Sequence, residues 1–310
     1  MRWITYRHNG CERVGVVTQD DLVHGLEPGR SLLDVLRSDT GLAGHVREVL
    51  DDPQHVAALD EVHICGLLQP PSIRDYLGFL DHFRAGAQVE GIVVDPRIEQ
   101  IPAFYFSSPA TILGPTDDVA IFPGSQRFDF ELEVAAVIGT PGRNISRHDA
   151  LNHIAGYTIF CDWSARDLQA VELPIGTGPA KSKDGAQTLG PFLVTPDEIE
   201  SYRAGKGFAL QMTASVNGEQ VSSGRWDSID WDFADMIAYA SRGADLRAGD
   251  VLGTGTVPTG CLVEAFAADP DGFRGWLQPG DRVELAVERL GSTRQQVTAA
   301  EPVEPLSTGF

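Results

Sequence analysis

The sequence predicts an α+β protein that is mostly β, with a small N-terminal α+β domain followed by a larger domain. The chain has 310 residues, which is enough for one large domain or two unequal ones. Its 33 glycines and 19 prolines favour strands and loops over a helical bundle. Residues 69–71 read QPP, and paired prolines cannot continue a helix or a central strand. We therefore predict domains at residues 1–69 and 70–310.

The expected elements follow in chain order. Residues 1 to about 66 should form short strands and turns, with one helix at 31–37 that Ser31 can cap and a second near 45–50. Beyond residue 70, segments rich in β-forming residues and bounded by Gly, Pro or Asp predict strands. These segments lie at residues 119–121, 128–138, 157–160, 208–216, 250–252 and 282–287. Helices are expected at 146–154 and 232–241.

The charge and the apolar segments exclude several classes of partner. The formal charge is −20, from 24 basic and 44 acidic residues, so nucleic acid and anionic membrane surfaces would be repelled. The apolar run at 134–138 is too short to cross a bilayer, and the N-terminus lacks the apolar core of a secretory signal. We expect a cytoplasmic protein.

The cysteines do not predict a disulfide framework or a zinc knuckle. Cys11, Cys65, Cys161 and Cys261 are widely spaced, without a C-x-x-C pair. We interpret each as a small buried residue.

An acidic strand is the most informative segment. Residues 128–134 read FDFELEV, so in a strand the apolar residues share one face while Asp129, Glu131 and Glu133 share the other. Carboxylates two residues apart are ~6.6 Å apart along a strand, and long side chains can converge from that distance. Crowded carboxylates need a cation or a proton, and oxygen ligands favour Mg²⁺, Mn²⁺ or Ca²⁺. A half-exposed strand with a hydrated acidic face explains the same pattern equally well.

A second segment adds another acid and two donors. Residues 157–169 read YTIFCDWSARDLQ, an apolar strand that runs into Asp162 and then a polar turn. Arg166 and Gln169 are three residues apart, which places them on one face of a helical turn. Beside a carboxylate-bound metal they would hold a carboxylate or carbonyl oxygen. The alternative is a surface pair of Arg166 with Asp167 beside a buried Trp163.

Together these segments resemble the fumarylacetoacetate hydrolase family. The resemblance continues through further motifs in the same order: FSSPA at 106–110, GP at 114–115, GPAKSKD at 178–184, TLGP at 188–191, GDVLGTGT at 249–256, GCLVE at 260–264 and QPGDRVE at 278–284. It covers residues 74 to 297. It implies a mixed β-roll catalytic domain with flanking helices behind the small N-terminal domain, and a homodimer formed through the catalytic domain.

The resemblance also implies roles for individual residues. The implied metal ligands are Glu131, Glu133 and Asp162, with a further aspartate, Asp75, seven residues before a general-base histidine, His82. Glu264 would orient His82. The remaining implied residues stabilise an oxyanion (Arg166, Gln169 and Lys181) or contact the substrate (Tyr105, Thr256, Leu77 and Gly255). Asp129 is expected beside the metal rather than bound to it.

The implied function is a divalent-metal-dependent hydrolase that cleaves a carbon–carbon bond of a β-diketone or acylpyruvate-type acid. The ion would be Mg²⁺, or Mn²⁺ or Ca²⁺, and the partner a small oxo acid or diketone. Histidine suits the activation of water near neutral pH, and a carboxylate partner fixes its tautomer. Two alternatives stay open: decarboxylation, isomerisation or dehydration of a related 2-oxo acid through the same enolate, and a non-catalytic metal-stabilised binding protein.

Three departures from the family pattern lie near the expected substrate. Leu77 replaces a tyrosine found in many relatives, and Cys161 replaces an asparagine. The lysine loop at 181–185 reads KSKDG and lacks the usual aromatic residue. These positions bear on the substrate rather than on the metal.

Overall fold

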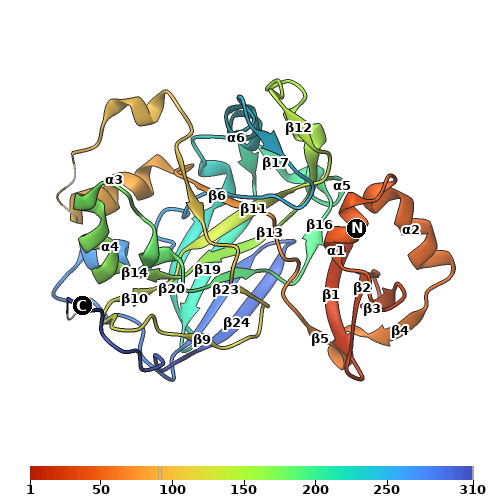
Figure 1. Cartoon of the computed structure of the whole chain (residues 1–310), viewed down its shortest axis with the longest axis horizontal. Coiled ribbons are helices and arrows are strands. Elements are labelled where there is room, and N and C mark those ends of the chain that lie inside the picture. The colour runs from red at the N-terminus through yellow and green to blue at the C-terminus, as the bar shows by residue number, and fades with distance from the viewer. Residues whose placement is uncertain (90, 92, 309–310) are drawn as a thin grey trace.

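The computed structural model describes residues 1–89, 91 and 93–308. It contains a 13-stranded sheet, a five-stranded sheet and three two-stranded sheets (Figure 1). Strands outnumber helices, so the prediction of a mostly β, α+β protein is confirmed. Among the described residues, no helix is both long and apolar enough to span a bilayer.

The N-terminal part is an antiparallel strand set with two helices. Its elements are β1 (Arg2–His8), β2 (Cys11–Val17), β3 (Leu22–Gly25), α1 (Leu32–Arg37), α2 (Gly41–Asp51), β4 (His55–Ala58) and β5 (His63–Ile64). Ser31 caps α1 as predicted, because its side chain accepts a hydrogen bond from the backbone N–H of Asp34. β1 also pairs with β16 (Leu193–Val194) of the larger part, so one sheet runs through both parts. The boundary at residue 69 stays a prediction.

The rest of the 13-stranded sheet carries the centre of the molecule. Its strands are β6 (Ile73–Tyr76), β7 (Phe104–Ser107), β8 (Ile112–Leu113), β11 (Leu132–Ile138), β13 (Ile154–Asp162), β15 (Gln187–Leu189), β16 and β22 (Val251–Gly253). The order runs β16-β13-β11-β22-β6-β7. All neighbours in this series are antiparallel except β22 and β6, which are parallel.

A five-stranded sheet packs against this centre (Figure 1). Its strands are β9 (Val119–Ala120), β19 (Gln211–Val216), β20 (Glu219–Arg225), β23 (Arg282–Val287) and β24 (Gly291–Thr298). Val134, Ala136 and Ile138 of β11 belong to the apolar core on this side. Ala135 and Val137 face a second core, which includes α1 and β1 of the N-terminal part. β11 is therefore buried on both faces.

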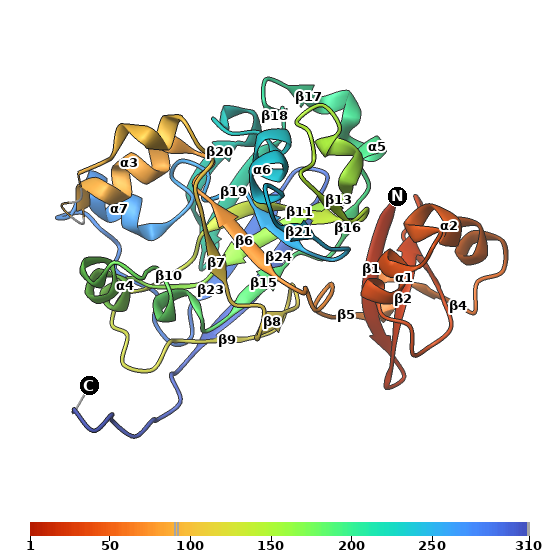
Figure 2. The same ribbon diagram turned by 45° about the horizontal axis from the view of Figure 1, so that its top comes forward.

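Short strand pairs and helices complete the fold. The pairs are β10 (Phe128–Asp129) with β14 (Ser164–Ala165), β12 (Gly142–Arg143) with β21 (Asp245–Leu246), and β17 (Arg203–Ala204) with β18 (Gly207–Phe208). The helices are α3 (Leu80–Val89), α4 (Arg166–Glu172), α5 (Pro196–Ile199), α6 (Phe233–Ala240) and α7 (Leu262–Ala268). α3 lies against α7, and α4 lies across from them (Figure 2).

Three sequence expectations need correction. The strand expected at 208–216 is divided into β18 and β19, because β18 pairs with β17 whereas β19 belongs to the five-stranded sheet. The strand expected at 128–138 is interrupted at Phe130 and Glu131, because β10 pairs with β14 whereas β11 belongs to the 13-stranded sheet. The helix expected at 146–154 is only a 3₁₀ turn, Ala150–His153, because β13 begins at Ile154. The helix expected at 232–241 is present as α6, with Asp232 as its N-cap.

Candidate active site

Four acidic side chains converge from separate elements. Asp75 lies on β6, Glu133 on β11 and Asp162 at the end of β13, while Glu131 lies in the break between β10 and β11. Sheet pairing brings them together, since β11 lies between β13 and β22, and β22 pairs with β6. Gly253 of β22 faces Asp75, and a Cβ at Gly253 would lie 2.8 Å from Asp75 Oδ1. A glycine is therefore needed for the carboxylate to enter the cluster.

The carboxylates form a buried acidic cluster. Asp75, Glu131 and Glu133 each offer an oxygen within 4.8 Å of the others. Asp162 adjoins them through Tyr105, whose Oη lies 2.6 Å from Asp75 Oδ2 and 2.5 Å from Asp162 Oδ2. One phenolic hydrogen can be donated to only one of these two oxygens at a time.

Lys183 is the cation inside this cluster. Its Nζ lies 2.5 Å from Glu131 Oε2 and 2.9 Å from Asp162 Oδ2. Burial opposes the charge on Lys183, but Asp162 and Glu131 outweigh burial and raise the pKa of the ammonium. Burial likewise opposes ionisation of Glu131, but Lys183 and Arg166 outweigh it and lower the pKa of that carboxyl.

Arg166 is held at the start of α4. Its Nε donates to Asp129 Oδ2 at 2.8 Å and its Nη1 donates to Gln169 Oε1 at 3.1 Å, while Nη1 lies 2.8 Å from Glu131 Oε1. Asp129 also accepts a hydrogen bond from the backbone N–H of Leu262. Asp129 thus fixes Arg166 and the start of α7 rather than joining the acidic cluster.

The donor set fits a divalent cation. Among the described residues, the acidic cluster and its neighbour Asp129 contribute five buried carboxyl groups (Asp75, Asp129, Glu131, Glu133 and Asp162), and the buried cations that contact them are Arg166 and Lys183. Oδ1 of Asp75 and Oδ1 of Asp162 are buried without a hydrogen-bond partner. Burial, then the neighbouring Asp162, raise the pKa of Asp75 to about 8. Burial, then Asp75 and Glu131, raise the pKa of Glu133. An oxygen-preferring ion would compensate this excess charge and complete the unpartnered oxygens.

The structure corrects one predicted residue. Lys181 points outward, with 60% of its side chain exposed and its Nζ 2.7 Å from Asp184 Oδ2. Lys183, with 3% exposed, takes the place in the cluster that the sequence assigned to Lys181. The two lysines lie on one 3₁₀ turn, Lys181–Lys183, in which Lys181 faces outward while Lys183 faces inward.

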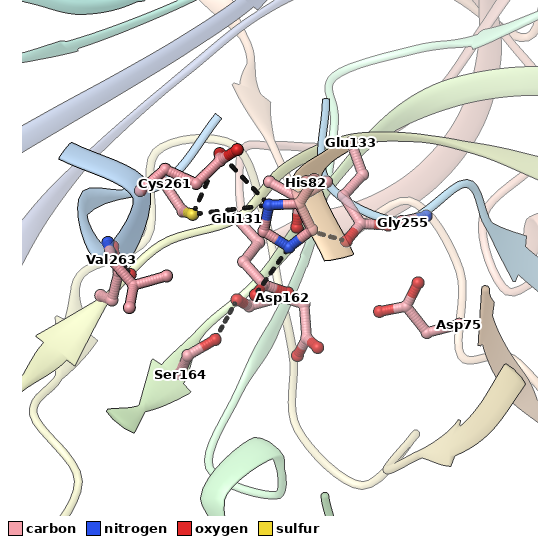
Figure 3. Close-up of polar contacts among 12 residues, drawn as sticks. Asp75, His82, Glu131, Glu133, Asp162, Ser164, Gly255, Cys261 and Val263 are labelled. Atoms are coloured by element: carbon pink, nitrogen blue, oxygen red, sulfur yellow. Dashed lines mark hydrogen bonds and ion pairs between the residues drawn. The ribbon is translucent and has the colours of Figure 1, made fainter. Parts of the chain in front are cut away.

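His82 lies next to the acidic cluster. Its Nδ1 is 3.2 Å from Glu264 Oε2, and its Nε2 is 4.0 Å from Glu131 Oε1 (Figure 3). The carboxylate of Glu264 therefore favours the tautomer with hydrogen on Nδ1, which leaves the Nε2 lone pair facing the cluster. α3 supplies His82 and α7 supplies Glu264, so the contact between these two helices builds the pair. Of the four cysteines interpreted from the sequence as buried, Cys65, Cys161 and Cys261 are buried, whereas Cys11 is exposed on β2. Cys261 contacts both side chains of the pair.

A cavity of about 300 Å³ opens above these groups. The four residues expected to contact the substrate line it, namely Leu77, Tyr105, Gly255 and Thr256. Of the three residues expected to stabilise an oxyanion, Arg166 and Gln169 line it and Lys181 does not. The rest of its wall is largely apolar, including Phe83, Ala87, Ala103, Phe104, Leu173 and Val263. The cavity therefore has a polar end at the acidic cluster, and most of its remaining wall is apolar.

The glycine-rich turn after β22 supports Glu133. The backbone N–H of Gly255 donates to Glu133 Oε2 at 2.8 Å, and Thr256 Oγ1 lies 3.5 Å from Glu133 Oε1. Gly255 has φ +81°, and a Cβ there would lie 2.2 Å from the backbone oxygen of Tyr76. Only glycine fits this close approach.

Comparison with known proteins places the chain in a family. Residues 72–298 match the family model described as fumarylacetoacetate (FAA) hydrolase C-terminal. A mitochondrial oxaloacetate tautomerase of Homo sapiens is 36% identical over 190 residues, which are 61% of this chain and 57% of the human protein. A 2,4-didehydro-3-deoxy-L-rhamnonate hydrolase of a Sphingomonas species is 34% identical over 199 residues, covering 64% of this chain and 65% of that protein.

A solved structure superposes on nearly the whole chain. A fumarylacetoacetate hydrolase from the psychrophile Exiguobacterium antarcticum superposes with a TM-score of 0.73 at 28% identity, covering 96% of this chain and 99% of that one. The family model covers most of the chain, and the two relatives described above are enzymes. The chain is therefore an enzyme that belongs to the fumarylacetoacetate hydrolase family.

Proposed function

We propose that this enzyme is a divalent-metal-dependent hydrolase that cleaves the carbon–carbon bond of an acylpyruvate-type oxo acid. The observation that carries the proposal is the His82–Glu264 pair. The Nε2 of His82 faces the acidic cluster and lies 4.0 Å from Glu131 Oε1. A histidine in this state is a general base for water, and hydrolysis needs such a base whereas metal binding alone does not.

The residues that would hold the ion are Asp75, Glu131, Glu133 and Asp162. When bound, the ion supplies positive charge for the oxygen atoms of the oxo acid. Mg²⁺, Mn²⁺ and Ca²⁺ all suit carboxylate oxygens. Lys183 and Arg166 add two fixed positive charges at the same end of the cavity, where negative charge develops on the substrate.

The proposed reaction uses one water and returns one proton. His82 Nε2 takes a proton from water, and the hydroxide adds to the acyl carbonyl carbon of the substrate. The carbon–carbon bond then breaks, and its electron pair remains on the pyruvate fragment as an enolate, next to Lys183 and Arg166. The protonated His82 returns the proton to the enolate carbon. The products are a carboxylic acid and pyruvate, and Glu264 stabilises the positive imidazole between the two transfers.

The cavity wall favours a substrate with a single carboxylate. Arg166 and Lys183 are the only lysine or arginine residues among the described residues that line the cavity, and both lie at its polar end. The remaining wall offers the apolar side chains of Phe83, Leu173 and Val263 to the substrate. A second carboxylate buried there would lose its hydration without gaining a cation, which is costly. An apolar acyl chain would instead bury its surface.

The relatives support a second candidate, tautomerisation of an oxo acid. The human relative is an oxaloacetate tautomerase, and a base that accepts and returns a proton could also move one between the carbon and the oxygen of a substrate. The extent of the apolar wall argues against oxaloacetate, which carries two carboxylates.

A substrate comparison tests the proposal. The purified enzyme with Mn²⁺ is incubated with an acylpyruvate that has an apolar acyl chain, and separately with oxaloacetate, and the products are quantified. We expect equal amounts of carboxylic acid and pyruvate from the first, and a slower reaction with the second. Enol–keto conversion of oxaloacetate with no acid released from the acylpyruvate would contradict the hydrolase and support the tautomerase.

Removing the base should separate chemistry from binding. We expect His82→Gln to lower kcat for acylpyruvate by about 10²–10⁴-fold, the usual contribution of a general base, while Mn²⁺ affinity stays within a few-fold of wild type. His148→Gln, at an exposed histidine, is the matched control and should behave as wild type. Steady-state kinetics and isothermal titration with Mn²⁺ measure the two effects. Unchanged turnover in His82→Gln would show that His82 is not the base.

A further inference from the structure

Three different donor atoms meet on the side of His82 that faces away from the acidic cluster. Cys261 Sγ lies 3.8 Å from His82 Nδ1 and 3.4 Å from Glu264 Oε2, and His82 Nδ1 lies 3.2 Å from Glu264 Oε2. Figure 3 shows the thiol on one side of the imidazole and Glu131 on the other. The proposed hydrolysis uses the histidine and the glutamate, but it gives the thiol no part.

These separations are those of a tetrahedral metal site. Zinc–ligand bonds of about 2.3 Å to sulfur, 2.0–2.1 Å to nitrogen and 2.0–2.2 Å to oxygen place neighbouring donors about 3.3–3.6 Å apart at tetrahedral angles. The three observed distances, from 3.2 to 3.8 Å, match this spacing within a few tenths of an ångström. An ion could therefore bind with small side-chain adjustments.

The chemistry of this donor set differs from that of the acidic cluster. Sulfur and imidazole nitrogen favour Zn²⁺ or Co²⁺, whereas the carboxylates favour Mg²⁺, Mn²⁺ or Ca²⁺. His82 lines the cavity, and both Cys261 and Glu264 contact its Nδ1, so the group adjoins the cavity although Cys261 itself is buried. Three protein ligands leave a fourth position for water or for an inhibitor atom.

We propose that His82, Cys261 and Glu264 form a second metal site, which binds Zn²⁺ and thereby switches the enzyme off. The thiol releases its proton to solvent when the ion binds. The ion takes the place of the hydrogen on Nδ1, and that hydrogen moves to Nε2. The imidazole stays neutral, but its Nε2 now carries hydrogen and can no longer accept a proton from water. Binding depends only on the three donors, whereas the inhibition rests on the proposed role of His82.

Cobalt absorption tests binding without reference to activity. The enzyme is saturated with Mg²⁺ and titrated with Co²⁺, and the near-ultraviolet thiolate-to-cobalt charge-transfer band is recorded. We expect a band in the wild type and in Cys11→Ser, the control for the exposed cysteine, and no band in Cys261→Ser. Cobalt bound to carboxylates alone gives no such band, since sulfur is absent there. No band in the wild type, or a band that persists in Cys261→Ser, would overturn the site.

A second variant keeps the test decisive if Cys261→Ser does not fold. Glu264→Gln removes the oxygen ligand but keeps the thiolate, so the band should remain while the apparent Kd for Co²⁺ rises at least about tenfold. An unchanged Kd would exclude Glu264 from the site.

Inhibition by zinc is measured separately on acylpyruvate hydrolysis at saturating Mg²⁺. The Zn²⁺ concentration for half-inhibition, relative to each variant's own zinc-free rate, should rise at least about tenfold in Cys261→Ser. Equal half-inhibition in both proteins would show that zinc acts at the carboxylates, and would overturn the switch while leaving the hydrolase intact. An enzyme that forms the cobalt band but does not hydrolyse acylpyruvates would instead reject the proposed function and keep the site.

Discussion

Lys183 occupies the position in the acidic cluster that the sequence predicted for Lys181. It is the buried cation between Glu131 and Asp162, whereas its neighbour Lys181 is exposed and paired with Asp184. Sequence motifs identified the loop correctly but could not decide between two lysines separated by one residue. That decision depends on which side chain the turn directs inward, and this depends on contacts with distant elements.

The same substitution should impair the enzyme at Lys183 and have little effect at Lys181. Lys183→Met leaves Glu131 and Asp162 without their cation, and should lower kcat/KM by about 10²–10³-fold, as for other groups that stabilise a developing negative charge. It should also lower the free energy of unfolding of the metal-free protein by about 3–5 kcal/mol, the usual loss when a buried ion pair is broken. Lys181→Met is the matched control. Equal kinetics and denaturation midpoints for the two variants would contradict the assignment.

Asp75 should govern the pH dependence of the metal-free protein. Its pKa is raised to about 8 in the folded state, against about 4 in an unfolded chain, so the folded state holds the extra proton between these values. Stability is therefore fully present below about pH 4 and is lost as the pH rises through about 8. In EDTA, the Tm of wild type should fall relative to that of Asp75→Asn between pH 5 and about pH 8.5.

Metal should reverse the order of these two proteins. With saturating Mn²⁺ at pH 8, wild type should have the higher Tm, because Asp75→Asn loses a proposed ligand and with it part of the stabilisation by binding. Thermal denaturation in both conditions provides the comparison. Parallel pH profiles in EDTA would show that Asp75 does not carry the raised pKa.

At the scale of elements, a short turn completes the site that the paired strands build. The turn Lys181–Lys183 is fixed by Glu172 at the end of α4, whose carboxylate accepts four hydrogen bonds. The donors are the backbone N–H groups of Ala180, Lys181 and Ser182 and the hydroxyl of Ser182. Burial opposes ionisation of Glu172, but these hydrogen bonds outweigh burial and lower its pKa. Neither the composition nor the motifs pointed to this residue.

Glu172→Gln tests this support. An amide oxygen accepts fewer and weaker hydrogen bonds than a carboxylate, so the turn should loosen and Lys183 should lose its fixed position. We expect kcat to fall about tenfold or more with little change in Mn²⁺ affinity, because the carboxylate ligands lie on other elements. Glu198→Gln, at an exposed glutamate of α5, is the control. Wild-type kcat in Glu172→Gln would exclude a positioning role.

The sequence predicted the site better than it predicted the strand that carries it. The expected alternation along 128–138 placed Asp129, Glu131 and Glu133 on one face, but the strand breaks at Glu131. Asp129 consequently turns toward Arg166 and α7, while Glu131 and Glu133 join Asp75. The acids were identifiable because they lie in short motifs. The break was not, because it arises from β10 pairing with β14, more than 30 residues further along the chain.

At the scale of the molecule, the N-terminal part is tied to the catalytic part. β1 extends the central sheet through β16, and Trp3 and Val35 belong to the same apolar core as Val137 and Phe160. The prolines within residues 69–71 predicted a domain boundary, but nothing in the sequence indicated this shared core. The homodimer and the cytoplasmic location stay predictions.

Removal of residues 1–69 should therefore destabilise the remainder. The truncated chain would expose the side of β11 and β13 that carries Val137 and Phe160, and exposed apolar patches of this kind promote aggregation. We expect a lower Tm and aggregation on size-exclusion chromatography, and a single unfolding transition for the full chain. A well-behaved fragment with the Tm of the full chain would show that the two parts are energetically independent.

The cavity has a polar end and an otherwise largely apolar wall, and this contrast affects how such an enzyme can change during evolution. Two of the acids, Glu133 and Asp162, lie on β11 and β13, which are buried from both sides, so a change there would disturb chemistry and folding together. Phe83 on α3 and Leu173 in the turn after α4 are only partly buried and belong to neither apolar core, so a change in side-chain size there has a smaller effect on the core. Substitutions in the apolar wall can therefore change the substrate that is accepted, while the residues that carry out the reaction stay the same.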